Sequence, residues 1–152
     1  MEVSFGQMTT KRSITKKDPE TLRKYLVYRH QIGTPQSADE LIYEEKDDKF
    51  SVGIGKTLTN AFVLIYSYSS TTSEIQLIDA NIAKASPKVF LARKAGHLYE
   101  VEHHENGFYV LSNDQAVNSR VLFSKDIPTD LASCQEVIKH NPKVLIEGLT
   151  VF

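Results

Sequence analysis

The fold of this chain is decided by the stretch from Phe50 to Arg93, which reads FSVGIGKTLTNAFVLIYSYSSTTSEIQLIDANIAKASPKVFLAR. β-branched and aromatic residues recur there with a period of two, and Ser, Thr, Gly and Pro separate the runs, as is typical of short strands. The stretch predicts four strands, at Phe50–Lys56, Asn60–Ser67, Glu74–Asp79 and Val89–Arg93. The second of them is almost continuously apolar, so we expect it to be buried on both faces. A single small sheet is marginally stable and must pack against others.

The same order of strands returns on both sides of this stretch. Opening strands are predicted near Phe50, Leu98 and Val144, third strands near Tyr25, Glu74 and Ser119, and fourth strands near Leu41, Val89 and Glu136. The Asn106-Gly107 pair predicts a hairpin in the downstream copy, because this dipeptide favours a tight turn between two strands. The spacing of roughly 45–49 residues matches that of propeller blades with four strands each. The repeat is one of strand order and not of residue identity.

The predicted fold class is therefore all-β, a segment of a β-propeller with about two and a half four-stranded antiparallel blades. We expect the end of one blade at 18–49, full blades at 50–93 and 98–140, and the first strand of a following blade at 143–152, with 1–17 left unassigned. Asp18-Pro19-Glu20 predicts a turn, or alternatively the start of a short helix. Because such a set of blades cannot close, we expect a piece of a longer polypeptide whose uncovered edges favour self-association.

Composition and charge exclude several classes of protein. The chain has 152 residues, a formal net charge of −1 and 24% charged residues, so no electrostatic attraction to nucleic acid or an anionic membrane is expected. The N-terminus lacks the profile of a signal peptide, and no apolar run approaches the roughly 20 residues of a membrane span. Cys134 is the single cysteine, which fits a reducing compartment and predicts a cytoplasmic location.

A glycine-rich segment, Gly53-Ile-Gly-Lys-Thr57, superficially resembles a phosphate-binding loop. That motif requires a glycine five positions before the Gly-Lys pair and a helix after it. Phe50 occupies the first place, and the segment that follows is predicted to be a strand. We therefore interpret the segment as the end of a strand.

Histidines and glutamates gather near one predicted hairpin and suggest a metal site. The candidates are His97, Glu100, Glu102, His103, His104 and the more distant His140. Neighbouring residues of a strand point to opposite faces, so His103 and His104 do not readily bind one ion. Surface or hairpin positions are the favoured interpretation, and His30 is interpreted as an ordinary strand residue.

The remaining candidates for chemistry have plain structural interpretations. The sequence contains no Gly-x-Ser-x-Gly nucleophile elbow, and Cys134 has no local activating pattern. Paired carboxylates at Glu44-Glu45 and Asp47-Asp48 are expected in a solvated turn, and the serines and threonines of 67–73 in a polar hairpin connection. The sequence thus assigns no catalytic, cofactor-binding or metal-binding residue.

An ordered set of short motifs resembles the prolyl oligopeptidase family of serine peptidases, and within it the oligopeptidase B (protease II) group. The motifs are Val27-Tyr-Arg-His30, Gly33-Thr-Pro35, Leu41–Phe50, Val52-Gly-Ile54, Ser69–Glu74, Leu77-Ile-Asp79, Gly96-His97, Tyr99, Phe108-Tyr109, Ser112-Asn113 and Pro142–Gly148. The resemblance runs from about Asp18 to Phe152 and is weak over residues 1–13.

The resemblance implies a two-domain serine oligopeptidase in which a seven-bladed β-propeller covers an α/β-hydrolase domain. It implies cleavage of short peptides after Arg or Lys, with no cofactor. The matching part is all propeller, and no catalytic triad position of the family falls in this sequence. The leading hypothesis is therefore a non-catalytic propeller segment that gates substrate access, with the hydrolase domain as its partner. Rivals are an independent β-rich interaction module and, more weakly, a small metal hydrolase using His103 or His104.

Overall fold

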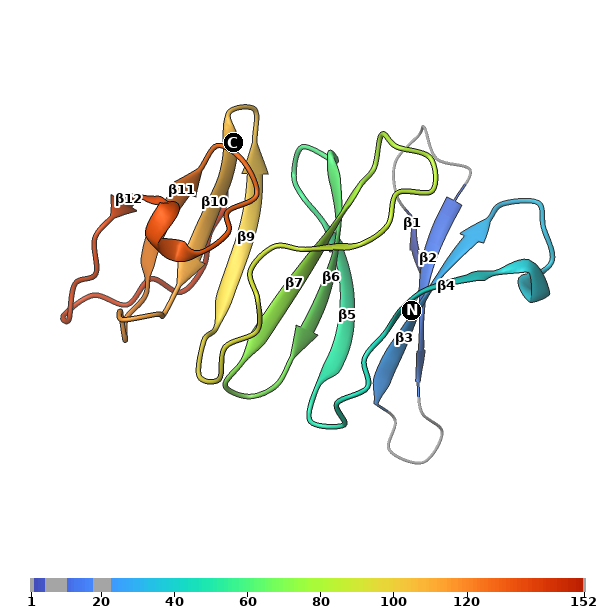
Figure 1. Cartoon of the computed structure of the whole chain (residues 1–152), viewed down its shortest axis with the longest axis horizontal. Coiled ribbons are helices and arrows are strands. Elements are labelled where there is room, and N and C mark those ends of the chain that lie inside the picture. The colour runs from blue at the N-terminus through green and yellow to red at the C-terminus, as the bar shows by residue number, and fades with distance from the viewer. Residues whose placement is uncertain (1, 5–10, 18–22, 152) are drawn as a thin grey trace.

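The computed structural model describes residues 2–4, 11–17 and 23–151. Its strands form three four-stranded antiparallel sheets that lie side by side in chain order (Figure 1). The first sheet contains β1 (Glu2–Ser4), β2 (Lys11–Lys17), β3 (Lys24–Gln31) and β4 (Glu40–Glu44). The middle sheet contains β5 (Ser51–Lys56), β6 (Phe62–Tyr68), β7 (Ser73–Asp79) and β8 (Lys88–Val89). The third sheet contains β9 (Tyr99–His104), β10 (Gly107–Ser112), β11 (Arg120–Ser124) and β12 (Gln135–Ile138).

The strands of each sheet pair in the order in which they occur in the chain. Corresponding strands recur at a regular distance: β3, β7 and β11 begin at residues 24, 73 and 120, and β4, β8 and β12 begin at residues 40, 88 and 135. The predicted repeat of strand order is therefore present, and the all-β fold class is confirmed. In the part of the chain that the structure describes, two short 3-10 helices, η1 (Gln36–Ala38) and η2 (Leu131–Ser133), lie in the connections between third and fourth strands.

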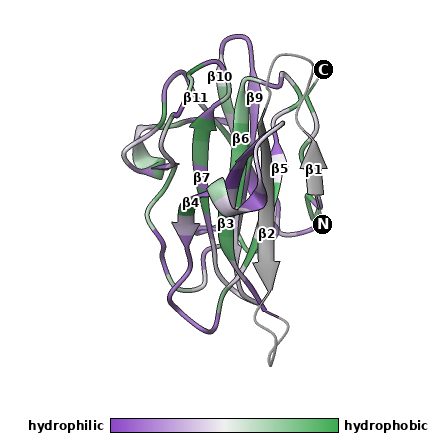
Figure 2. Cartoon of the chain, turned by 90° about the vertical axis from the view of Figure 1, so that its right-hand side faces the viewer, coloured by the Kyte–Doolittle hydropathy of each residue, from purple (hydrophilic) through white to green (hydrophobic). Residues whose placement is uncertain are grey.

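The middle sheet is buried on both faces because its strands are apolar at successive positions. On β6, Leu64 packs into the core shared with the third sheet, whereas Ile65 packs into the core shared with the first sheet. On β7, Leu77 likewise packs into the core shared with the third sheet, and Ile78 into the core shared with the first sheet. Successive side chains of a strand point to opposite faces, so an uninterrupted apolar run covers both. Figure 2 shows hydrophobic residues along such strands as β3 and β7, and mostly hydrophilic connections.

Tyr99, at the start of β9, links the third sheet to the middle one through hydrogen bonds. Its backbone N–H donates to Ser73 Oγ at 2.9 Å, and Ser73 Oγ donates to the Tyr99 carbonyl at 3.2 Å. Its hydroxyl accepts from the Ile75 N–H at 2.8 Å and donates to the Leu91 carbonyl at 3.1 Å. The ring is buried, so each of these polar groups is satisfied inside the protein, which fixes the two sheets against each other.

The first sheet is more complete than the sequence predicts. We expected only the later strands of a blade at 18–49, but β1 and β2 lie within the unassigned residues 1–17, where β1 pairs with β2 and β2 pairs with β3. The described residues therefore form three four-stranded sheets, rather than about two and a half blades. β1 has only three residues and β2 reads KRSITKK, so neither shows the apolar alternation that identifies a strand. The predicted turn at Asp18-Pro19-Glu20 lies outside the described residues.

Two predicted strands are shorter or missing. The strand expected at Val89–Arg93 is reduced to Lys88–Val89, because Phe90 and Leu91 turn into the core. The strand expected at the start of 143–152 does not form within the described residues, where only a bridge between Asn141 and Val144 occurs. A strand needs a neighbour to complete its ladder of hydrogen bonds, and beyond this bridge the segment makes only isolated backbone contacts, such as the Ile146 N–H donating to the Asn118 carbonyl at 3.1 Å.

Candidate functional site

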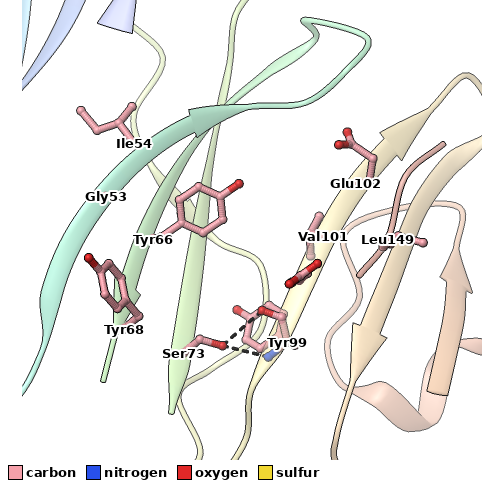
Figure 3. Close-up of a pocket in the computed structure, with 10 residues that line it drawn as sticks. Gly53, Ile54, Tyr66, Tyr68, Ser73, Tyr99, Val101, Glu102 and Leu149 are labelled. Atoms are coloured by element: carbon pink, nitrogen blue, oxygen red, sulfur yellow. Dashed lines mark hydrogen bonds between the residues drawn. The ribbon is translucent and has the colours of Figure 1, made fainter. Parts of the chain in front are cut away.

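A pocket of about 480 Å³ opens between the middle and third sheets, beside β5, β6, β7 and β9 (Figure 3). Its lining includes Glu100 and Glu102 from β9 and Tyr66 and Tyr68 from β6. Each pair is two residues apart in a strand, which places both members on the same face. None of the ten lining residues, all within the described part of the chain, is a lysine, arginine or histidine. The pocket is therefore acidic and aromatic.

The aromatic wall exists because the neighbouring strand has glycines opposite it. Gly53 pairs with Tyr66 in the β5–β6 ladder. A Cβ atom added to Gly55 would lie 2.8 Å from the Tyr66 ring, so the ring occupies the space that a side chain would need. Tyr68 remains 48% exposed at the same wall. The segment that superficially resembles a phosphate-binding loop, Gly53–Thr57, lies at the end of β5 as expected, and its glycines accommodate the tyrosine ring.

The negative charges of Glu100 and Glu102 affect the ionisation of Tyr66 in the pocket. Glu102 Oε1 accepts hydrogen bonds from the backbone N–H groups of Leu58 and His103, both at 2.9 Å, which hold this carboxylate in place. Burial, followed by the charges of Glu102 and Glu100, raises the pKa of Tyr66 to about 12. The Tyr66 hydroxyl is protonated at neutral pH, as it would be at its ordinary pKa, and the contributions of Glu102 and Glu100 show that both carboxylates are close enough to influence it.

A second cluster ties the first sheet to the middle one through Arg93. The guanidinium donates to Glu45 Oε2 at 2.5 Å and lies 3.4 Å from Glu74 Oε1. Its central carbon stands 3.8 Å from the centre of the Phe50 ring, a cation–π contact. Tyr43 donates to the same Glu45 oxygen at 2.9 Å. These contacts join residues from both sheets in one network.

The environment of Glu45 differs from the one expected from the sequence. We expected a solvated turn, but Glu45 is 5% exposed, and its other oxygen accepts from the Asp47 N–H at 3.0 Å. Burial alone would raise the pKa of this carboxyl, but the hydrogen bonds from Arg93, the Asp47 N–H and Tyr43 outweigh burial and lower the pKa. The partner that changes its environment, Arg93, is 48 residues away in the sequence. No local pattern could therefore reveal it.

The connectors that leave each fourth strand are held in a repeated manner, always by a residue near the start of the third strand. Arg23 donates to the carbonyls of Glu45 and Phe50, and Glu74 accepts from the Arg93 N–H at 3.1 Å. Asn118 donates to the carbonyl of Pro142 at 2.9 Å. Each connector is thus held by a side chain at the corresponding position, although that side chain is an arginine, a glutamate or an asparagine. The repeat is therefore preserved in position and not in residue type.

The histidines of the metal hypothesis are not brought together. His97 is buried, where its Nε2 atom contacts Ser112 Oγ at 2.8 Å, and burial lowers its pKa. His103 contacts Thr59 Oγ1 at 2.8 Å, and His104 pairs with Gly107 at the hairpin. Within residues 2–4, 11–17 and 23–151, no three metal-binding side chains form a group. His30 belongs to β3 and contacts Asp39 Oδ1 at 2.7 Å.

The remaining candidates take structural positions. Burial raises the pKa of the Cys134 thiol, so the thiol is not activated as a nucleophile. Within the expected polar connection, Ser69 Oγ accepts from the N–H groups of Thr71 and Thr72, at 3.4 and 3.1 Å, and closes the β6–β7 turn. Ser67 instead belongs to β6 and contacts Tyr43 at 2.7 Å.

Sequence reasoning considered Glu100 and Glu102 only as metal ligands and overlooked Tyr66 and Tyr68. The usable signal was the two-residue spacing of each pair, which places its members on one face. The sequence does not show that β6 and β9 lie next to each other, because these strands belong to different sheets.

Known proteins share this architecture. Residues 9–152 match the family model described as prolyl oligopeptidase, N-terminal beta-propeller domain. Protease 2 from Moraxella lacunata is 35% identical over 133 residues, which is 88% of this chain and 19% of the relative. Dipeptidyl aminopeptidase BI from Pseudoxanthomonas mexicana is 34% identical over 140 residues, 90% of this chain and 19% of the relative. Oligopeptidase B from Trypanosoma brucei, solved with covalently bound antipain in its closed form, has a TM-score of 0.86 at 36% identity and covers 94% of this chain and 20% of that structure.

These matches define the three sheets as consecutive blades of a β-propeller. The chain belongs to the prolyl oligopeptidase family, and the part of the family that it matches is the N-terminal propeller domain. It spans about a fifth of the length of the curated relatives. None of the helices in the described part of the chain has the length and apolar character needed to cross a membrane.

Proposed function

We propose that this chain is the non-catalytic propeller portion of a serine oligopeptidase, where it limits access of substrates to a hydrolase domain of the same polypeptide. The observation that supports this most strongly is the match of residues 9–152 to the propeller domain of the family. The names of similar proteins, Protease 2 and oligopeptidase B, support a peptide as the substrate.

The packing of the blades suggests how such a portion would act. The middle blade has apolar cores on both faces, so neighbouring blades form a tightly packed wall. A wall of this kind rejects folded proteins by steric exclusion while short peptides reach the enclosed site. In the proposed enzyme, the hydrolase domain supplies the Ser, Asp and His and cleaves after Arg or Lys. We place the enzyme in the cytoplasm, for which the single cysteine is suitable.

A graft into a relative tests the proposal. The chain replaces the matching segment of the T. brucei oligopeptidase B, and the chimera is assayed with a short Arg-containing chromogenic peptide and with a large folded protein. We expect cleavage of the peptide and protection of the folded protein, whereas the isolated chain should turn over neither. Turnover by the isolated chain, or loss of size selection in a folded chimera, would contradict the proposal.

An independent interaction module is the second candidate. Val137, Ile138, Val144 and Leu145 are each at least 50% exposed, which provides apolar surface for a partner or a second copy. If this is the function, the graft should fail to support peptide cleavage even where the chimera folds.

A further inference from the structure

The pocket between the middle and third blades contains negative charge without a matching cation. The carboxylate of Glu100 forms no hydrogen bond or ion pair with any described residue, and only one oxygen of Glu102 is occupied by backbone N–H groups. None of the described residues that line the pocket has a basic side chain. Two carboxylates in one partly enclosed pocket repel each other, and a cation between them relieves that repulsion.

The other wall of the pocket suits a cation as well. Tyr66 and Tyr68 line it from β6, and Gly53 provides no side chain of β5 to fill the space beside them. The faces of tyrosine rings attract ammonium and guanidinium groups, with a contribution of about 0.5–1 kcal/mol at exposed sites. Figure 3 shows Tyr66 and Glu102 on facing sides of the hollow.

The size of the pocket agrees with an organic cation rather than a bare metal ion. Its volume of about 480 Å³ lies within the range of sites that take small organic ligands. Apolar lining from Ile54, Val101 and Leu149 suits the aliphatic part of an arginine or lysine side chain. Aromatic faces, aliphatic surface and carboxylates thus occur together in one hollow.

We propose that this pocket binds the cationic side chain of a basic peptide. In this proposal, the carboxylates of Glu100 and Glu102 contact the charged group, and the ring faces of Tyr66 and Tyr68 pack against it. The side chain enters between β6 and β9, and its guanidinium or ammonium group lies between the carboxylates and the tyrosine rings. The choice of a peptide as the source of the cation rests on the proposed function, whereas the binding itself does not. The pocket would then hold basic substrates on the propeller at a point that contains no catalytic group.

The test is a titration of the whole chain followed by NMR. The probes are Nα-acetyl-arginine amide and its uncharged analogue, Nα-acetyl-citrulline amide, in a buffer of low ionic strength. We expect saturable shifts of the backbone signals of Tyr66, Glu100 and Glu102, with a dissociation constant of about 1–10 mM for the arginine probe and about tenfold weaker binding of citrulline. Added salt should weaken the arginine complex, because surface charge pairs are screened.

Variants separate the pocket from non-specific attraction. Glu100→Gln combined with Glu102→Gln should weaken the arginine complex about tenfold. The side-chain oxygen introduced by Glu102→Gln can still accept the two backbone hydrogen bonds. Tyr68→Leu should weaken it about two- to fivefold. Glu44→Gln is the matched control, because Glu44 is an exposed residue of β4 outside the pocket, and it should leave binding unchanged. If the double variant does not fold, Glu100→Gln alone replaces it, since Glu100 is exposed.

Equal affinity for arginine and citrulline, shifts confined to other residues, or undiminished binding by the folded variants would overturn the proposal. The absence of saturable binding would do so too. Such a result would leave the peptidase assignment intact, because the graft measures peptide cleavage and size selection and not this contact. A failed graft with intact arginine binding would instead reject the peptidase assignment alone.

Discussion

Gly107 shows how one residue decides the geometry of a hairpin. It pairs with His104 and has a φ of 144°, a conformation that residues with a side chain rarely adopt. A Cβ atom placed there would lie 2.8 Å from the Lys125 Cα atom. The sequence predicted the hairpin correctly from Asn106-Gly107. It did not show that Lys125, 18 residues later, passes so close to the glycine.

Replacing Gly107 should therefore destabilise the chain strongly. We expect Gly107→Ala to lower the free energy of unfolding by about 2–4 kcal/mol, because backbone strain and a collision with the backbone near Lys125 add together. Gly33→Ala is the control: Gly33 has a φ of 91° but no atom within 4 Å of an added Cβ, so about 1 kcal/mol is expected. Urea denaturation measures both. Equal losses would show that the close approach at Gly107 is wrong.

At the scale of elements, the connectors between blades depend on contacts made far along the chain. Glu45 accepts hydrogen bonds from Arg93, Tyr43 and the Asp47 N–H, and therefore links the connector after β4 to the one after β8. Strands are predictable because their period is local. These links are not, since both partners look like ordinary surface charges in the sequence.

Removing the charge of Glu45 tests this link between blades. We expect Glu45→Gln to lower the free energy of unfolding by about 1–3 kcal/mol, because Arg93 then keeps a half-buried charge without its closest partner. Glu44→Gln changes the neighbouring exposed carboxylate and should cost no more than about 0.5 kcal/mol. The midpoints of urea unfolding curves provide the comparison. A loss for Glu45→Gln as small as that of the control would contradict the network.

Strand prediction succeeded where the pattern was long and apolar, and failed where it was short or polar. The bounds of β6 were predicted to within two residues, and the start of β11 to within one, because apolar residues dominate both strands. β1 and β2 were missed, because three residues and a lysine-rich run show no alternation. The segment after Asn141 is apolar enough for a strand, yet among the described residues it forms only an isolated bridge and scattered backbone hydrogen bonds instead of a ladder.

At the scale of the whole molecule, the order of blades was predictable and the pocket between them was not. Regular spacing of strands indicated a propeller before any contact was known. The pocket depends on Tyr66 meeting Glu102 across two blades, which requires the angle and distance between sheets. Self-association through uncovered edges stays a prediction, and Val137 and Ile138 on β12 are the exposed apolar residues most relevant to it.

The central claim is that the chain folds as a row of consecutive blades, and nuclear Overhauser contacts between methyl groups test it most directly. We expect contacts from Val27 of the first blade to Val52 and Ile78 of the middle one, and from Leu77 of the middle blade to Val110 of the third. No contact should join Val27 to Val110, because the middle blade stands between them (Figure 1). Contacts between the first and third sheets, as in a closed barrel or a two-sheet sandwich, would contradict the account.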